Sequence, residues 1–341
     1  MKLTEEWGIL FKSNQTIYLY GAGDVAKFLI KKAVQDGVSD KIKGILVSNK
    51  DSSTPYSIDN IPVLEAKSAD DKNAIVLIAT SRKWSDEIRL CASELGFSDI
   101  RDGFKYLHVY DEATVLGDEA KERLEFLKKE EKSLDVLKEK LRIMYGINQM
   151  FSNEGEFYQS LPLLGIEGER PTDLRIQTYG LEEIVEGKTI IDIGCNTGFL
   201  DITLASKAKS ICGIEYNESL VNIANEVIEY LDLTNVLVCQ GDFLTFHSEK
   251  KYEVVLLFAV HGWLGCSAEE GAKKIVDLLD QDGTVVFESQ AWDKGDPLYS
   301  QYCYWFEKNG MRKIRSGKIC DDGKTNREWC VYSFNPGQLP R

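Results

Sequence analysis

The stretch TIIDIGCNTGFLDITLA, residues 189–205, decides the fold of this chain. An apolar, β-branched run is followed by two glycines, Gly194 and Gly198, and then by apolar residues at helical spacing. This order predicts a buried strand that turns sharply into a helix. Glycines let the backbone approach a ligand closely, and the first N–H groups of a helix are free to donate hydrogen bonds. We therefore expect a ligand with hydrogen-bond acceptors at this turn.

Three carboxylates lie within or directly after the predicted strands of the same region. Asp192 lies in the strand before the turn, Glu215 ends the next apolar run in CGIEYN, and Asp242 follows the third in CQGDF. The carboxyl ends of the strands of a doubly wound sheet meet around one crevice, so we expect these side chains to lie close together. Glu215 can accept both hydroxyls of a ribose, and Asp242 with Phe243 can hold and stack an adenine.

The turn lacks the features of a phosphate site. Phosphate binding favours G-x-G-x-x-G spacing or a P-loop lysine, whereas this turn reads GCNTG with acidic neighbours. A cofactor with a ribose, no phosphate and a positive charge suits carboxylates better. S-adenosylmethionine has these properties, because its sulfonium is positive. We therefore predict this cofactor.

Strands and helices alternate from residue 150 onward. The predicted strands are TIIDIG (189–194), SICGIE (210–215), NVLVCQGD (235–242), YEVVLLFAV (252–260), GTVVFES (283–289), MRKIRSGK (311–318) and REWCVYSF (327–334). Helical segments are predicted after the first, second and fourth of these strands, which favours parallel pairing. The last two surround a turn, so the sheet should be mostly parallel with an antiparallel finish.

Four motifs, IIDIGCNTGF, GIEYN, QGDF and YEVVLLFAVHGW, make residues 150–335 resemble a class I S-adenosylmethionine-dependent methyltransferase. The resemblance implies a seven-stranded, mostly parallel sheet with an antiparallel terminal hairpin. It also implies a set of cofactor contacts. These are Asp192, Gly194, Cys195, Asn196, Gly198, Glu215, Tyr216, Asp242, Phe243 and Ala259. A relative that has kept the fold without the activity is the alternative.

The segment FYQSLPLLGIEGERPTDLRIQTYG, residues 157–180, precedes this core. Its Y-Q and G-x-R-x-x-x-x-R pattern resembles the lead-in of methyltransferases that act on bacterial surface polysaccharides, and that of enzymes modifying the tRNA wobble uridine. The resemblance implies that Tyr158 and Arg170 hold the methionine end of the cofactor, where a guanidinium suits a carboxylate. A surface lead-in with ordinary ion pairs is the alternative.

Two residues are candidates for catalysis. His261 closes the fourth strand and Glu288 the fifth, where either side chain can take a proton from an acceptor hydroxyl. Both also have non-catalytic readings, His261 as a hydrogen-bonding residue that shapes the pocket and Glu288 as a substrate anchor. Trp263 and Trp292 flank them and either stack on a sugar or pack in the core.

Residues 1–110 predict a smaller doubly wound Rossmann-like domain. A G-x-G-x-x-A turn with Gly21, Gly23 and Ala26 follows the strand TIYLYG, but the next strand ends in VSN (47–49), where a dinucleotide would require a carboxylate. NAD is therefore not expected. IPVLEA and IATSRKW resemble the nucleotide-sugar-binding N-terminal domain of bacterial sugar acyltransferases. This implies a ligand-binding or docking module, with purely structural packing as the alternative.

Residues 111–149 predict a helical connector between the two domains, the second of which spans 150–341. Leucines and one methionine recur there at three- or four-residue spacing among lysines and glutamates. This amphipathic stripe either packs against the chain's own domains or forms a homo-oligomeric coiled coil over 111–145, although Glu131 and Lys138 interrupt a strict heptad.

Composition limits the partners. The formal net charge of −14 repels polyanions, so no nucleic-acid partner is expected. The eight cysteines form no C-x-x-C pair, which predicts reduced thiols and no metal site. No run approaches the ~20 apolar residues of a membrane span and the N-terminus does not resemble a secretory signal, so a cytoplasmic protein is expected.

These features together predict an S-adenosylmethionine-dependent methyltransferase. Its expected acceptor is a small-molecule or glycan substrate, methylated on an oxygen of a sugar or sugar phosphate of surface glycan biosynthesis. Two alternatives are a tRNA-modifying methyltransferase and a non-enzymatic nucleotide-binding scaffold with a vestigial methyltransferase fold.

Overall fold

The computed structural model describes residues 3–12, 15–51, 54–80, 84–103, 106, 118–146, 157–290, 295–323 and 325–334. The chain divides into two compact units, Met1–Lys121 and Glu122–Arg341. The second unit therefore includes most of the segment predicted as a connector. Among the described residues, no helix is long and apolar enough to cross a membrane.

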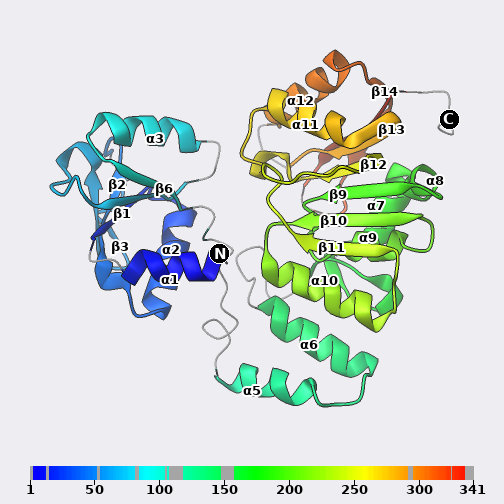
Figure 1. Cartoon of the computed structure of the whole chain (residues 1–341), viewed down its shortest axis with the longest axis horizontal. Coiled ribbons are helices and arrows are strands. Elements are labelled where there is room, and N and C mark those ends of the chain that lie inside the picture. The colour runs from blue at the N-terminus through cyan, green and yellow to red at the C-terminus, as the bar shows by residue number, and fades with distance from the viewer. Residues whose placement is uncertain are drawn as a thin grey trace. The chain divides into compact units, whose positions relative to one another are not determined.

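The first unit contains a six-stranded sheet in the order β3-β4-β2-β1-β5-β6 (Figure 1). All neighbouring strands are parallel except the short pair β3 and β4. The strands are β1 (Ile17–Tyr20), β2 (Ile42–Val47), β3 (Ser57–Ile58), β4 (Ile61–Glu65), β5 (Ile75–Ile78) and β6 (Asp99–Asp102).

Helices cover both faces of this first sheet. They are α1 (Leu3–Lys12), α2 (Asp24–Gln35) and α3 (Ser85–Glu94), with 3-10 turns η1 (Ser39–Lys41) and η2 (Ala66–Ser68). Leu10 of α1 and Leu29 of α2 are buried with Leu19 on one face, whereas Ala92 of α3 is buried with Tyr18 on the other. The unit is thus doubly wound, as the strand and helix pattern predicts, whereas α1 and the strands β3 and β4 were not predicted.

The second unit contains a seven-stranded sheet in the order β11-β10-β9-β12-β13-β15-β14 (Figure 1). Its strands are β9 (Thr189–Ile193), β10 (Ser210–Glu215), β11 (Val236–Gln240), β12 (Tyr252–Phe258), β13 (Leu279–Glu288), β14 (Arg312–Ile319) and β15 (Arg327–Ser333). Strand β15 runs antiparallel to both neighbours and the other pairs are parallel. The prediction of seven strands with an antiparallel terminal hairpin is confirmed.

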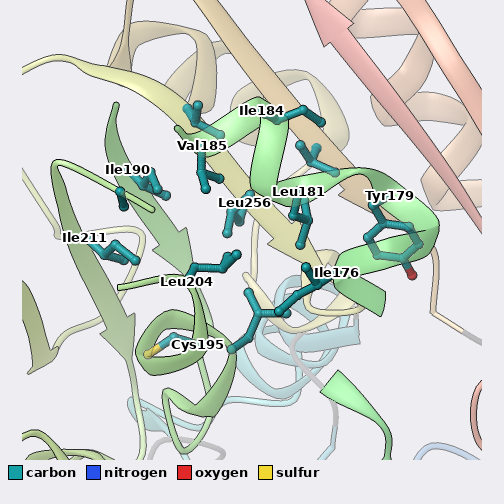
Figure 2. Close-up of a cluster of buried hydrophobic side chains, with 14 of the residues drawn as sticks. Ile176, Tyr179, Leu181, Ile184, Val185, Ile190, Cys195, Leu204, Ile211 and Leu256 are labelled. Atoms are coloured by element: carbon teal, nitrogen blue, oxygen red, sulfur yellow. The ribbon is translucent and has the colours of Figure 1, made fainter. Parts of the chain in front are cut away.

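Two hydrophobic clusters sandwich this second sheet. One lies under α7 (Thr172–Tyr179), α8 (Leu181–Val185), α9 (Phe199–Leu204) and α10 (Glu218–Tyr230), and the other under α11 (Ala268–Leu278) and α12 (Pro297–Lys308). Figure 2 shows Leu181 and Ile184 of α8 beside Ile190 of β9 and Leu256 of β12. Alternate residues of the strands point to opposite clusters, so each strand is buried on both sides.

Helix α12 was not predicted, because its aromatic-rich sequence lacks a clear helical stripe. Its start does carry a signal. Asp296 caps the helix by accepting a hydrogen bond from the backbone N–H of Tyr299 at 2.9 Å, and Pro297 occupies the first helical position.

The helical segment before the core forms α5 (Asp118–Leu127) and α6 (Leu134–Gly146). Leu137 and Leu141 of α6 are buried, and α6 packs on α10 (Figure 1). Lys140 forms an ion pair with Glu226 of α10. Packing within its own unit, one of the two alternatives for the amphipathic stripe, therefore accounts for α6.

A short lead-in joins α6 to the core. It comprises the parallel pair β7 (Phe157–Gln159) and β8 (Gly168–Arg170) with the 3-10 turn η5 (Pro162–Leu164), and a further 3-10 turn, η6 (His261–Trp263), follows β12. Strand β8 leads directly into α7. Tyr158 and Arg170 of the lead-in thus belong to the same unit as the glycine turn.

Candidate active site

The glycine turn adopts a backbone that ordinary residues avoid. Gly194, Asn196 and Gly198 have φ angles of 75°, 58° and 64°, which lie in the left-handed region. A Cβ atom on Gly194 would be 2.4 Å from Cγ2 of Val260, so the loop after β12 presses directly on the turn. Glycine is therefore required at 194 both by its φ angle and by this contact.

Glu215 lies at the end of β10 and faces the turn. Its Oε2 accepts a hydrogen bond from the backbone N–H of Asn196, and its Oε1 accepts one from Asn217, each at 2.9 Å. Burial raises the pKa of Glu215, and the backbone hydrogen bonds oppose that rise. The side chain is half-buried rather than turned into the core. The predicted approach of the first two strand ends is therefore present.

Other residues predicted to contact the cofactor differ in how far their side chains are exposed. Tyr216 and Asp242 are half-buried, and Asp242 Oδ1 accepts a hydrogen bond from the N–H of Leu244 at 2.9 Å. The ring of Phe243 is only 5% exposed in the cluster under α11. Its ring faces therefore do not form the open stacking surface that we expected. Ala259 has a φ angle of 53°, which is unusual for alanine.

Asp192 and Cys195 are almost completely buried on the face that carries α9. Asp192 is 3% exposed and Cys195 1%. Burial and nearby carboxyl groups hold the pKa of the Cys195 thiol well above its ordinary value. The thiol is consequently neutral and inert.

A network of buried charges lies beside this face. Arg170 donates to both oxygens of Asp321, at 2.7 and 2.9 Å, to Glu288 at 2.7 Å and to the hydroxyl of Tyr158 at 3.2 Å. The side chains of Arg170, Glu288 and Asp321 are at most 1% exposed. The lead-in arginine is thus a buried residue with its own partners, so the alternative of a surface lead-in does not apply to it.

Glu288 lies within the same network. It accepts hydrogen bonds from Arg170, Arg175 and Tyr179. Burial alone would raise the pKa of Glu288, but the two guanidinium groups outweigh this and lower it to about 2. A carboxylate that remains ionised down to this pH is a poor proton acceptor at neutral pH.

Arg175 belongs to the same network, and the sequence analysis assigned it no role. It is 1% exposed and donates to Glu288 at 3.1 Å, while its Nη1 has no hydrogen-bond partner among the described residues. Its guanidinium lies 5.0 Å from the ring centre of Phe258, at the end of β12, and acts electrostatically on Asp192. The G-x-R-x-x-x-x-R pattern already contained this residue.

His261 lies on the other face of the sheet from Glu288. It is 1% exposed and packs against Phe287 and Tyr302 of the cluster under α11 and α12. Its Nε2 is 2.9 Å from Oδ2 of Asp296. Burial would raise the pKa of Asp296, but the hydrogen bond and charge of His261 lower it. The two predicted catalytic residues therefore do not share one pocket wall.

Of the two tryptophans predicted to flank the catalytic residues, Trp263 lies within the described residues. Trp263 follows His261 in the same 3-10 turn and is 41% exposed. Trp292 lies outside the described residues. The ring of Trp263 is therefore partly exposed and not packed in the core.

The glycine turn of the first unit is also tightly packed. Gly21 has a φ angle of 121°, and a Cβ atom there would lie 2.4 Å from Cγ2 of Thr80. After β2, Ser48 is 3.0 Å from the hydroxyl of Tyr20 through its Oγ. The position where a dinucleotide would require a carboxylate is thus occupied by a hydroxyl that binds the chain itself.

Comparison with known proteins identifies the core of the second unit. Residues 184–332 match the family model of a methyltransferase domain. The chain is 24% identical over 143 residues to a U6 snRNA methylphosphate capping enzyme of Drosophila melanogaster, covering 36% of this chain and 48% of that protein. It is 34% identical over 77 residues to an (S)-tetrahydroprotoberberine N-methyltransferase of Eschscholzia californica, covering 22% of each. The chain thus spans about half the length of these relatives or less.

Solved structures with a similar core include two methyltransferases. One, S-adenosylmethionine-dependent and from Aquifex aeolicus, is 18% identical with a TM-score of 0.38, and it covers 49% of this chain and 90% of that chain. The other, N-methyltransferase NodS of Bradyrhizobium japonicum with bound S-adenosylhomocysteine, is 13% identical with a TM-score of 0.40, and it covers 50% and 89%. The match over residues 184–332 supports a methyltransferase that uses S-adenosylmethionine as its cofactor.

Proposed function

We propose that this protein is an S-adenosylmethionine-dependent methyltransferase that methylates an oxygen of a sugar or sugar phosphate used for surface glycan. The proposal rests on the position of Glu215. Backbone N–H groups of Asn196 and Asn217 hold its carboxylate at the carboxyl-terminal end of β10, beside the glycine turn. The backbone N–H of Tyr216 also donates to this carboxylate. Because its two oxygens together have about four acceptor sites, the carboxylate can still accept a hydrogen bond from a ribose hydroxyl.

Arg175 is the residue that we assign to the carboxylate of the methionine end. Arg170, which sequence reasoning favoured, already donates to Asp321, Glu288 and Tyr158. Arg175 has an unpartnered, buried Nη1 among the described residues and lies near Asp192. An unpaired guanidinium N–H group is expensive to bury, so a carboxylate is a fitting partner for it. Glu288, which is itself bound by Arg170, then acts by holding Arg175 in place.

When bound, the cofactor supplies an electrophilic methyl group. The chain must then hold the acceptor in line with it and remove the proton of an acceptor hydroxyl. We assign the removal of this proton to His261. Its Nε2 lies 2.9 Å from Oδ2 of Asp296, and apart from this contact neither ring nitrogen has a hydrogen-bond partner among the described residues. The half-exposed Trp263 beside it is suited to pack on a sugar ring.

A sugar acceptor is favoured by the charge of the chain and by the resemblance of its lead-in. A net charge of −14 opposes binding to RNA, which the name of the Drosophila relative includes. That name nevertheless makes RNA modification the second candidate. A gel-shift assay with RNA separates the two, because only an RNA-binding enzyme would give a shift that weakens steeply with salt.

The test of the cofactor site is calorimetric titration with S-adenosylmethionine. We expect binding by the native chain, and a ten- to hundredfold weaker affinity for Glu215→Ala, since hydrogen bonds to a charged group contribute about 1.5–3 kcal/mol. Glu249→Ala, an exposed glutamate of the same unit, is the matched control. Absence of heat with the native chain would overturn the enzyme assignment in favour of a non-enzymatic scaffold.

The acceptor is then identified with a labelled methyl donor. Transfer of label to sugars or sugar phosphates supports the glycan assignment, and transfer to RNA alone overturns it. The first unit, whose turn contains Gly21 and Gly23, is proposed to bind or dock the carrier of that acceptor. Its removal should raise the KM for the acceptor and leave the affinity for the cofactor unchanged.

A further inference from the structure

Asp201, on α9, is a buried titratable residue that the proposed reaction does not use. Its side chain is 0% exposed, and neither carboxyl oxygen accepts a hydrogen bond from an N–H or O–H group of the described residues. An ionised carboxylate without donors is strongly disfavoured in such a place. The group must therefore be protonated, and its proton needs an acceptor.

Asp192 provides that acceptor. It is 3% exposed on β9, and its carboxyl group lies within hydrogen-bonding distance of Asp201. Two carboxyl groups in contact cannot readily ionise together, whereas a proton between them turns repulsion into a hydrogen bond. Burial raises the pKa of Asp192 to about 7 and that of Asp201 well above its ordinary value.

The neighbouring strand leaves room for this pair. A Cβ atom on Gly213 of β10 would lie 2.7 Å from Oδ2 of Asp201 and 2.7 Å from Sγ of Cys195. Any larger residue at 213 would thus displace the side chains of Asp201 and Cys195. Since Asp201 is packed against the backbone of β10, its carboxyl group cannot turn to solvent without opening the core.

The charges around the pair come from four other elements. Arg175 of α7 lowers the pKa of Asp192, while Glu215 of β10 and Glu288 of β13 raise it. Cys212 of β10 and Asp192 itself raise the pKa of Asp201. Cys195 in the turn stays a neutral thiol. Burial is the largest of these influences on the pKa of both aspartates and outweighs the guanidinium, so the pair retains its proton.

We propose that Asp201 is a positioning residue, which shares a proton with Asp192 and thereby fixes the orientation and charge of the carboxyl group that faces the cofactor. This inference rests on the proposed cofactor site. Asp201 keeps its proton throughout. The second proton, which Asp192 holds in part of the molecules near neutral pH, passes to solvent when a cationic cofactor binds, because a nearby positive charge favours the ionised form.

The experiment compares Asp201→Asn, which keeps a donor to Asp192, with Asp201→Leu, which does not. S-adenosylmethionine is titrated calorimetrically from pH 6 to 8.5 in buffers of different ionisation enthalpy, which reports the protons released. For the native chain we expect proton release near pH 7 and an affinity that rises with pH. Asp201→Asn should bind with little proton release and a flat profile. Asp201→Leu should lose about tenfold in affinity at pH 7.

Asp277→Asn, an exposed residue of α11, controls for the loss of one carboxylate. The proposal is overturned if Asp201→Asn matches the native pH profile and proton release, or if it binds as weakly as Asp201→Leu. Failure of the native chain to bind the cofactor would remove the proposed function alone.

The shared proton is tested separately by carboxyl NMR titration of the free protein. In this experiment Asp192 should titrate near pH 7 in the native chain and at lower pH in Asp201→Asn. Ordinary midpoints for both aspartates would overturn it.

Discussion

Arg170 donates two parallel hydrogen bonds to Asp321, 151 residues further along the chain, at 2.7 and 2.9 Å. Arg170 comes from the lead-in and Asp321 from the turn between β14 and β15. The pair therefore ties the segment that precedes the sheet to its terminal hairpin. Both side chains are at most 1% exposed, so water cannot compensate for the loss of either partner.

Replacing Arg170 by alanine should destabilise the second unit severely. Removal of one partner of a buried ion pair leaves an uncompensated charge and costs about 3–5 kcal/mol. Urea denaturation of the full chain measures this loss. Arg123→Ala, which removes an exposed pair with Glu139, should change the free energy of unfolding by less than about 1 kcal/mol. Equal effects of the two substitutions would contradict a buried tie.

Stability should fall in acid because of Glu288. Its pKa is about 2 in the folded chain against an ordinary value of 4.5, so between these values the unfolded state binds more protons. The contribution, about 3 kcal/mol, is complete above pH 4.5 and is lost as pH falls towards 2. Urea midpoints between pH 2.5 and 6 measure it. Glu288→Gln should be less stable at pH 6 and lose less on acidification, and an unchanged acid slope would refute the assignment.

Gly194→Ala should damage both stability and cofactor binding. The substitution places a methyl group 2.4 Å from Cγ2 of Val260 at a positive φ angle. Gly187→Ala is the matched control, because its φ angle is also positive, at 68°, but nothing lies within 4 Å of the new methyl group. We expect a loss of about 1–2 kcal/mol for the control, from the backbone alone. Gly194→Ala should lose about 1–3 kcal/mol more.

His261→Gln should lower kcat about 10²–10⁴-fold if the acceptor is a hydroxyl, since that is the usual contribution of a general base. The KM for S-adenosylmethionine should not change, because His261 lies under α12 rather than at the glycine turn. His247→Gln, an exposed histidine, is the control. Native kcat in His261→Gln would point instead to an acceptor that needs no base, such as a phosphate oxygen.

Local sequence patterns were enough to predict the strand, turn and helix around Gly194 and Gly198. β-branched residues favour the strand, and glycine supplies the positive φ angles, so neighbouring residues alone determine this element. The approach of Glu215 to the turn was also predictable, because parallel strands bring their carboxyl ends to one edge. The seven-strand order followed from the family resemblance.

Only the tertiary structure distinguished the two arginines of the lead-in by their hydrogen-bond partners. From the sequence, both belong to one pattern, and the resemblance favoured Arg170. Their partners Glu288 and Asp321 lie more than a hundred residues away, and these saturate Arg170 while leaving Nη1 of Arg175 open among the described residues. The same holds for Asp192 and Asp201, whose shared proton depends on burial. Burial and partners at long range are properties of packing, which the order of neighbouring residues does not encode.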